Sequence, residues 1–162
     1  MTMDMFLKLG NIKGESRDSQ HRDEIDIQSF QWGMTQNGSM HQGSGGGASK
    51  VSIQNLSITK ALDKSTPNLL MACSSGMHFP EATLTVRKAG GNQPLEYLVI
   101  RLKEVLVASF NTQAVNRSEV QAETFALNFA SVEVSYQPQK EDGGKAGGAL
   151  KYGWNIRENR KL

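Results

Sequence analysis

Apolar and polar residues alternate along most of this chain, and this pattern constrains the fold more than any other feature of the sequence. In the segments 82–86, 125–129 and 132–136 every second residue is apolar. Successive side chains of a β-strand point to opposite faces, so each segment would have one apolar and one polar face. Antiparallel sheets with one face on a core and the other in water show this alternation. The sequence therefore predicts a mainly β fold, either a sandwich or a barrel.

The alternation slips by one residue at two places, between Ile27 and Phe30 and between Ile53 and Leu56. The second slip resembles a β-bulge, in which an extra residue bends a strand. Residues 97–100 are apolar on both faces, which predicts either a central strand or a strand whose outer face meets a partner. The predicted strands cover residues 4–10, 23–33, 51–59, 80–88, 95–102, 104–112, 121–130, 131–137 and 150–157.

One segment departs from the alternation and predicts a short α-helix over about residues 66–76. Ser65 or Thr66 fits the N-cap, Pro67 fits the first turn, and Gly76 fits a left-handed stop. We expect this helix to plug one open end of a barrel. The residues expected on its shared apolar face are Leu69, Leu70 and Cys73.

Length, charge and hydropathy define the class of protein. The 162 residues, 38% of them hydrophobic, suffice for one core and predict a single domain over residues 1–162. A net charge of +2 is too small to predict nucleic-acid binding. The longest apolar run, 69–73, is far shorter than the ~20 residues of a membrane-spanning helix, and the first residues lack the features of a secretory leader. We expect a protein that is made in the cytoplasm, binds no nucleic acid and does not insert into membranes.

No catalytic or cofactor-binding motif is evident in the sequence. The three histidines and the single cysteine, Cys73, lack the spacing of a metal site. The glycine-rich run 43–50 resembles a phosphate-binding loop only superficially, because a predicted strand rather than a helix follows it. A hydrolase that uses Cys73 and His78 is a remote alternative, since nothing nearby in the sequence would orient the imidazole. We expect no catalytic residue, no metal and no cofactor, and hence a structural or interaction protein rather than an enzyme.

Eight short blocks, spread over almost the whole chain, occur in a characteristic order and spacing. They are DMF (4–6), GES (14–16), WGM (32–34), DKSTP (63–67), ACSSG (72–76), RKAGG (87–91), YQP (136–138) and KYGWN (151–155). Together they resemble the haemolysin-coregulated protein (Hcp) family of the type VI secretion system. The resemblance implies an antiparallel β-barrel of two sheets with one short helix.

The resemblance also implies a function in a contractile secretion apparatus. Subunits of the family form hexameric rings, and the rings stack into an inner tube that can carry effector proteins in its lumen. A contractile sheath drives the tube into a target cell behind a spike protein of the valine-glycine repeat family. The chain would then be cytoplasmic before assembly and secreted through this system without a signal peptide. Some members carry a C-terminal toxin domain; this sequence ends at Leu162, so we expect that activity to be absent.

Subunit contacts are expected at strand edges near residues 23–33 and 95–102. The 37–50 loop is expected to reach the next ring or a neighbour, because glycine allows backbones to approach closely. The alternative is a stand-alone secreted binding module whose ring assembly is incidental. The residues predicted for the ring or tube interface are Gln28, Phe30, Gly43, Gly45, Gly46, Tyr97 and Val99.

Effector contacts are predicted in the polar segment 111–118, which joins two predicted strands. By analogy with the family, this segment is expected to face the lumen of the ring. The residues predicted to contact effectors are Thr112, Val115 and Asn116.

Overall fold

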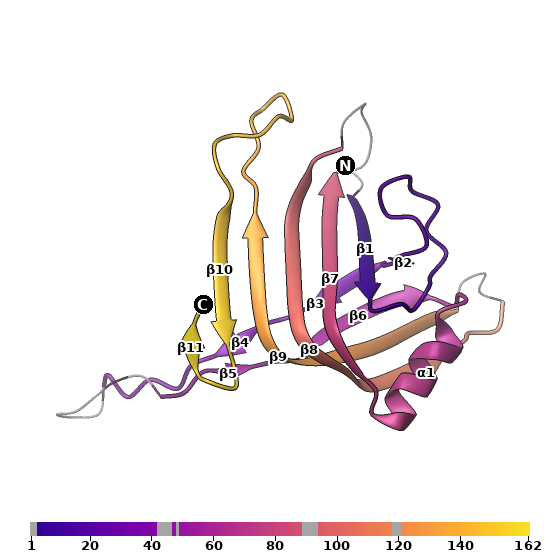
Figure 1. Ribbon diagram of the computed structural model, residues 1–162, viewed down its shortest axis with the longest axis horizontal. Helices are drawn as coiled ribbons and strands as arrows, with labels where there is room; N and C mark the ends of the chain where they lie inside the picture. The colour runs from indigo at the N-terminus through magenta and orange to yellow at the C-terminus, as the bar shows by residue number, and fades with distance from the viewer. Residues whose placement is uncertain (1–2, 42–46, 48, 89–93, 118–120) are drawn as a thin grey trace.

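The computed structural model describes residues 3–41, 47, 49–88, 94–117 and 121–162. It confirms a mainly β fold with antiparallel pairing and one short helix (Figure 1). The elements are β1 (Met3–Leu9), β2 (Ile25–Asp26), β3 (Ser29–Gln31), β4 (Met34–Thr35), β5 (Ser52–Ile53), β6 (Leu56–Ala61), α1 (Thr66–Ser75), β7 (His78–Lys88), β8 (Glu96–Gln113), β9 (Ala122–Tyr136), β10 (Leu150–Asn155) and β11 (Arg160–Lys161).

Two long strands, β8 and β9, run through both halves of the sheet, the half that contains β6 and the half that contains β10. Each was predicted as two separate strands, but each is continuous and bends between the halves (Figure 1). At this bend β8 carries Glu104 with a φ of +55° and a register shift between Val107 and Ser109. Such an irregularity turns a strand without ending its hydrogen-bonded ladder. The first half of β9 pairs with β6 and its second half with β10, so β9 contributes to both halves.

The barrel closes through the segment that contains β2 and β3. From β9 the pairing runs through β8 and β7 to β1, and on the other side through β6. β2 pairs with β1, whereas β3 pairs with β6. Between them the Ile27 N–H donates to the Met5 carbonyl at 3.0 Å and the Gln28 N–H donates to the Thr59 carbonyl at 2.8 Å. The slip between Ile27 and Phe30 thus marks the point where the chain changes partners.

The second slip has a different structural cause from the predicted bulge. β5, before the slip, pairs with β4 in a small separate sheet, and β6, after it, belongs to the barrel. The bulge prediction is therefore wrong, because the chain here passes from one sheet to another. β4 and β5 form the base of an arm that leaves the barrel at one end of the long axis (Figure 1). The described residues of this arm are 33–41, 47 and 49–54.

The helix α1 matches its predicted range closely. Gly76 ends it with a φ of +65°, as expected for a left-handed stop. Ser65 occupies the N-cap position but makes no capping hydrogen bond with its side chain, which donates to Asp63 instead. The inward face consists of Thr66, Leu69 and Ala72 with Cys73 half-buried beside them. Leu70, predicted on the inward face, is 45% exposed, which corrects that prediction.

Candidate functional site

A buried ion pair lies at the end of the barrel core, under the start of α1. Lys60 of β6 and Glu123 of β9 are opposite each other in the ladder, and both side chains are fully buried. Their Nζ and Oε2 atoms are 2.8 Å apart. Both residues are in phase with the apolar core positions of their strands: Lys60 comes after Ile58 in β6, and Glu123 comes before Phe125 in β9. The pair therefore forms a charged layer in line with the hydrophobic core.

Further polar groups surround this pair and connect it to the helix. The Lys60 ammonium also donates to Asp63 Oδ1 at 3.0 Å and to Thr66 Oγ1 at 3.2 Å. The Thr66 hydroxyl donates to Glu123 Oε2 at 2.8 Å. A buried charge is tolerated when it is paired and hydrogen-bonded. The cluster thus fixes the first turn of α1 on β6 and β9 and has the character of a structural clamp.

A second polar cluster fastens the segment 10–24 across the outer face of β1 and β7. Arg87, on β7, donates through Nη2 to Asp18 and lies 3.5 Å from Asp4 Oδ2. Its guanidinium carbon lies 5.0 Å from the centre of the Phe6 ring. The hydrogen bond from Arg87 holds the pKa of Asp18 below its ordinary value.

His21 is the second contact of this segment with the barrel. Its ring stacks on Phe6 at a centroid distance of 4.4 Å. Nδ1 lies 3.1 Å from Glu24 and Nε2 lies 2.7 Å from Glu96 at the start of β8. These contacts join the segment to β1 and β8.

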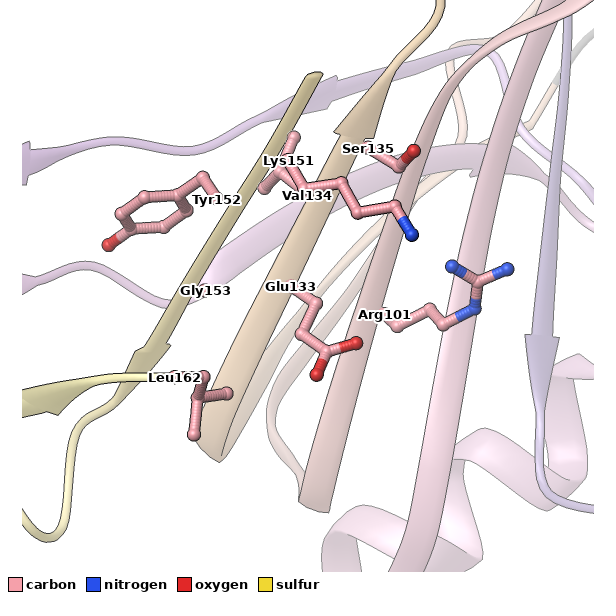
Figure 2. Close-up of a pocket in the computed structure, with 8 residues that line it drawn as sticks. All are labelled: Arg101, Glu133, Val134, Ser135, Lys151, Tyr152, Gly153 and Leu162. Atoms are coloured by element: carbon pink, nitrogen blue, oxygen red, sulfur yellow. The ribbon is translucent and has the colours of Figure 1, made fainter. Parts of the chain in front are cut away.

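An open hollow of about 280 Å³ lies on the outer face of β8, β9 and β10 (Figure 2). Arg101 and Glu133 are directly opposite in the ladder, and Lys151 is on the next strand. Gly153 permits Leu162 to lie over β10, because an added Cβ would be 3.0 Å from the Leu162 Cβ. The hollow is shallow and its charged side chains reach solvent, which suits a protein contact better than a small-molecule site.

The four described residues of the predicted ring interface fall into two pairs. Gln28 is exposed, and Phe30 is half-buried and packs against the core. Tyr97 and Val99 are half-buried on the outer face of β8. There β8 is paired on both sides, with β7 and with β9, so the strand edge expected near 95–102 is wrong. The prediction of a central strand for 97–100 is confirmed.

The structure describes the predicted effector contacts but not the predicted glycine contacts. Gly43, Gly45 and Gly46 lie outside the described residues. Thr112, Val115 and Asn116 are exposed and lie together at the end of β8 and in the turn that follows. Thr112 Oγ1 accepts a hydrogen bond from Gln121 at 2.9 Å.

Among the described residues no group of three or more His, Cys, Asp or Glu side chains is placed to hold a metal ion. Cys73 is half-buried and His78 is exposed, and no hydrogen bond of the described residues joins them. In the same part of the chain no helix is long and apolar enough to cross a membrane.

Sequence reasoning did not single out the buried cluster around Lys60. A signal was available, because Lys60 is in phase with Leu56 and Ile58, and Glu123 is in phase with Phe125. Opposite charges at core positions of two strands indicate a buried pair.

Comparisons with known proteins agree over the length of the chain. A family model described as "Type VI secretion system effector, Hcp" matches residues 6–136. The protein hcp1 of Pseudomonas aeruginosa is 60% identical over 159 residues, which are 98% of this chain and 98% of that protein. The crystal structure of Hcp1 from Salmonella typhimurium is 36% identical, with full coverage of both chains and a TM-score of 0.82. The structure of a type six secretion system protein is 27% identical, covers 99% of this chain and 100% of its own, and has a TM-score of 0.92.

Proposed function

Because the chain belongs to the Hcp family of type VI secretion proteins, we propose that it is the ring-forming subunit of the inner tube of that system. In this role six copies close into a ring, rings stack into a tube, and the lumen carries effector proteins. Its partners are further copies of itself, the effectors, the sheath proteins and the spike protein of the valine-glycine repeat family. The observation that carries the proposal is the likeness to a relative over 98% of both chains.

The proposed localisation of the protein follows from the same role. It is present in the cytoplasm before assembly and leaves the cell through the secretion system with the tube. The clusters around Lys60 and Arg87 support a structural rather than an enzymatic function, because their charged groups pair with one another and hold segments of the fold together.

The proposed role of the arm described above is to contact the next ring when rings stack. The arm leaves the barrel at one end (Figure 1) and is held by backbone hydrogen bonds such as that from Ser49 N–H to the Asn37 carbonyl at 3.2 Å. Gly43, Gly45 and Gly46 lie outside the described residues. The proposal for them remains that they contact the next ring, since glycine allows close backbone approach. Deletion of residues 41–48 should leave rings intact and abolish tubes. Normal tube formation and secretion by this variant would contradict the role of the arm.

Contacts between subunits use Gln28 and Phe30 on the segment that closes the barrel, and Tyr97 and Val99 on the outer face of β8. β3 pairs with β6 on one side only, among the described strands, and so keeps an edge for a neighbour. An unpaired edge is a natural site of strand addition.

Effector contacts use Thr112, Val115 and Asn116. Val115 is 61% exposed, so a bulky side chain there fits the isolated subunit. Val115→Trp should lower the amount of effector recovered with the ring while ring assembly persists. An unchanged effector level would contradict the proposal that this loop faces the lumen.

Mass in solution and negative-stain imaging test the proposal as a whole. The expected result is a six-subunit particle that appears as a ring with a central hole. A monomer at micromolar concentration would contradict the ring and favour a stand-alone binding module.

A further inference from the structure

An asparagine followed directly by a glycine, Asn37 and Gly38, lies in the arm that leaves the barrel (Figure 1). It is the one Asn-Gly dipeptide of the sequence. In such a pair the main-chain nitrogen of the glycine can attack the side-chain amide of the asparagine. The glycine has no Cβ to hinder the close approach that this ring closure needs. Whether the reaction occurs in a folded chain depends on the contacts around the two residues.

The main-chain N–H of Gly38 is left free by the hydrogen bonds on either side of it. On one side Ser49 N–H donates to the Asn37 carbonyl at 3.2 Å. On the other side Ser39 N–H donates to the Gly47 carbonyl at 3.1 Å. In an antiparallel pair the residue between two such bonds directs its own N–H away from the opposite strand. Among the described residues the Gly38 N–H accordingly has no acceptor, and nothing lies within 4 Å of a Cβ built on Gly38.

The carbonyl oxygen of Asn37 is surrounded by donors. When the Gly38 nitrogen gives up its proton to attack, the negative charge spreads onto this oxygen through the shared peptide bond. Ser49 approaches the oxygen twice, through its N–H at 3.2 Å and through its hydroxyl at 2.9 Å. The alternative acceptor of that hydroxyl is Gln36 Oε1 at 3.0 Å. Donors that are already placed on an atom where charge develops lower the barrier of the reaction.

The side-chain amide of Asn37 is exposed to solvent. The hydrogen bonds within the described part of the chain use its main-chain carbonyl, as with Ser49, and none uses its side chain. The amide is therefore free to turn toward the Gly38 nitrogen, and water has access to the product.

We propose that Asn37 is a site of spontaneous deamidation in the folded subunit. The Gly38 nitrogen forms a bond to Cγ of Asn37, the Cγ–Nδ2 bond breaks, and ammonia leaves with the proton that the Gly38 nitrogen loses. Water then opens the resulting cyclic imide at one of its carbonyls and leaves either aspartate or isoaspartate. Neither step changes an oxidation state, so the reaction needs only water.

The product changes the arm in charge and in backbone length. Residues 33–54 contain one formally charged side chain, Lys50, and no acidic one. Deamidation therefore gives the arm its first acidic group. Isoaspartate also adds an atom to the main chain just before Gly38, between the two hydrogen bonds that flank this residue, so both bonds cannot keep their present geometry. This chemistry goes beyond the proposed function and does not depend on ring formation.

Mass spectrometry of the full chain, incubated at mildly alkaline pH and then digested, tests the proposal. The peptide that contains Asn37 should gain the mass of an amide-to-acid exchange and separate into aspartate and isoaspartate forms. The peptide that contains Asn116, which is also exposed but precedes Arg117, is the internal reference and should stay unmodified over the same time. Gly38→Ala should lose most of the modification, because its methyl group hinders ring closure. An Asn37 that persists as the amide, or a Gly38→Ala variant that reacts as fast as wild type, would overturn the proposal.

Two serine variants test the structural basis of the reaction. Ser49→Ala removes one donor from the Asn37 carbonyl and should slow the reaction about two- to tenfold. Ser39→Ala is the matched control, since its hydroxyl donates to the Gly47 carbonyl at 3.3 Å in the same arm and does not touch Asn37. It should react at the wild-type rate. A Ser49→Ala variant as fast as wild type, or equal slowing in both variants, would overturn the assignment of Ser49 as the group that promotes deamidation.

Discussion

Lys60→Met should destabilise the subunit more than Glu123→Gln, because the two substitutions leave different charges unpaired. Without Lys60 the Glu123 carboxylate stays fully buried. Among the described residues its remaining donors are two neutral hydroxyls, that of Thr66 at 2.8 Å and that of Thr112 at 3.4 Å. Without the Glu123 charge the Lys60 ammonium still has the Asp63 carboxylate at 3.0 Å. The loss of one partner of a buried pair is costly chiefly through the charge left behind.

The expected sizes follow from these remaining contacts. Lys60→Met removes the cation that is paired with a buried carboxylate and should cost about 3–5 kcal/mol. Glu123→Gln keeps the Asp63 contact of Lys60 and leaves polar groups imperfectly matched, which should cost about 1–3 kcal/mol. The double variant Lys60→Met/Glu123→Leu leaves no buried charge on either strand. It should therefore be more stable than Lys60→Met alone.

Urea unfolding at one fixed protein concentration measures these differences. With a urea dependence of about 2 kcal/mol per M, a loss of about 4 kcal/mol moves the midpoint by about 2 M. Lys103→Met, at an exposed lysine on the outer face of β8, is the matched control and should change stability little. The reasoning is refuted if Glu123→Gln costs as much as Lys60→Met, or if the double variant is no better than the single one.

Three further perturbations test other parts of the fold. Arg87 lowers the pKa of Asp18, so the stability from this pair is present above the ordinary pKa of aspartate and is lost as the pH falls through the lowered value. Wild type should therefore lose its advantage over Asp18→Asn in urea unfolding between about pH 5 and about pH 2; a pH-independent difference would contradict the pairing. Burial and nearby carboxylates raise the pKa of Asp26, so its ionisation lowers stability as the pH rises through that value. Asp26→Asn should be more stable than wild type at neutral pH and equal to it at about pH 2. A variant that is less stable at neutral pH would show that the ionised Asp26 carboxylate does not destabilise the fold. An added Cβ on Gly14 would lie 2.5 Å from the Glu24 carbonyl oxygen, so Gly14→Ala should cost about 1–3 kcal/mol in thermal or urea unfolding. Gly38→Ala, with nothing within 4 Å of the added atom, is its control, and equal stability of the two variants would contradict the close approach.

Local patterns in the sequence predict the elements of this fold better than their connections. Pro67 and Gly76 act through their own backbone geometry, so they locate α1 to within a residue or two. The alternation in β8 and β9 gives the correct inner faces. It does not show that each strand is continuous, because Glu104 bends β8 while the ladder goes on. The change of partner after Ile27 leaves only a slip in the pattern, since pairing depends on strands that are distant in the sequence.

The candidate surfaces were less predictable than the fold. Tyr97 and Val99 could be placed on a central strand, but which face or edge stays open depends on the neighbours that pack there. From helical spacing Leu69 and Leu70 were both expected on the inner face of α1. Leu69 lies there together with Ala72, whereas Leu70 is exposed. The spacing of apolar residues was compatible with either choice, and the position of the barrel decided between them.

The closure of the barrel by β1, β2 and β3 has a consequence for how the chain acquires its structure. β1 is made first but pairs with β7, so it waits for a strand from the middle of the sequence. β3 likewise waits for β6, and β6 for β9. Folds dominated by such distant pairings fold slowly. Subunits should therefore fold after most of the chain has left the ribosome, with the edges of β1 and β3 open to chaperones until then.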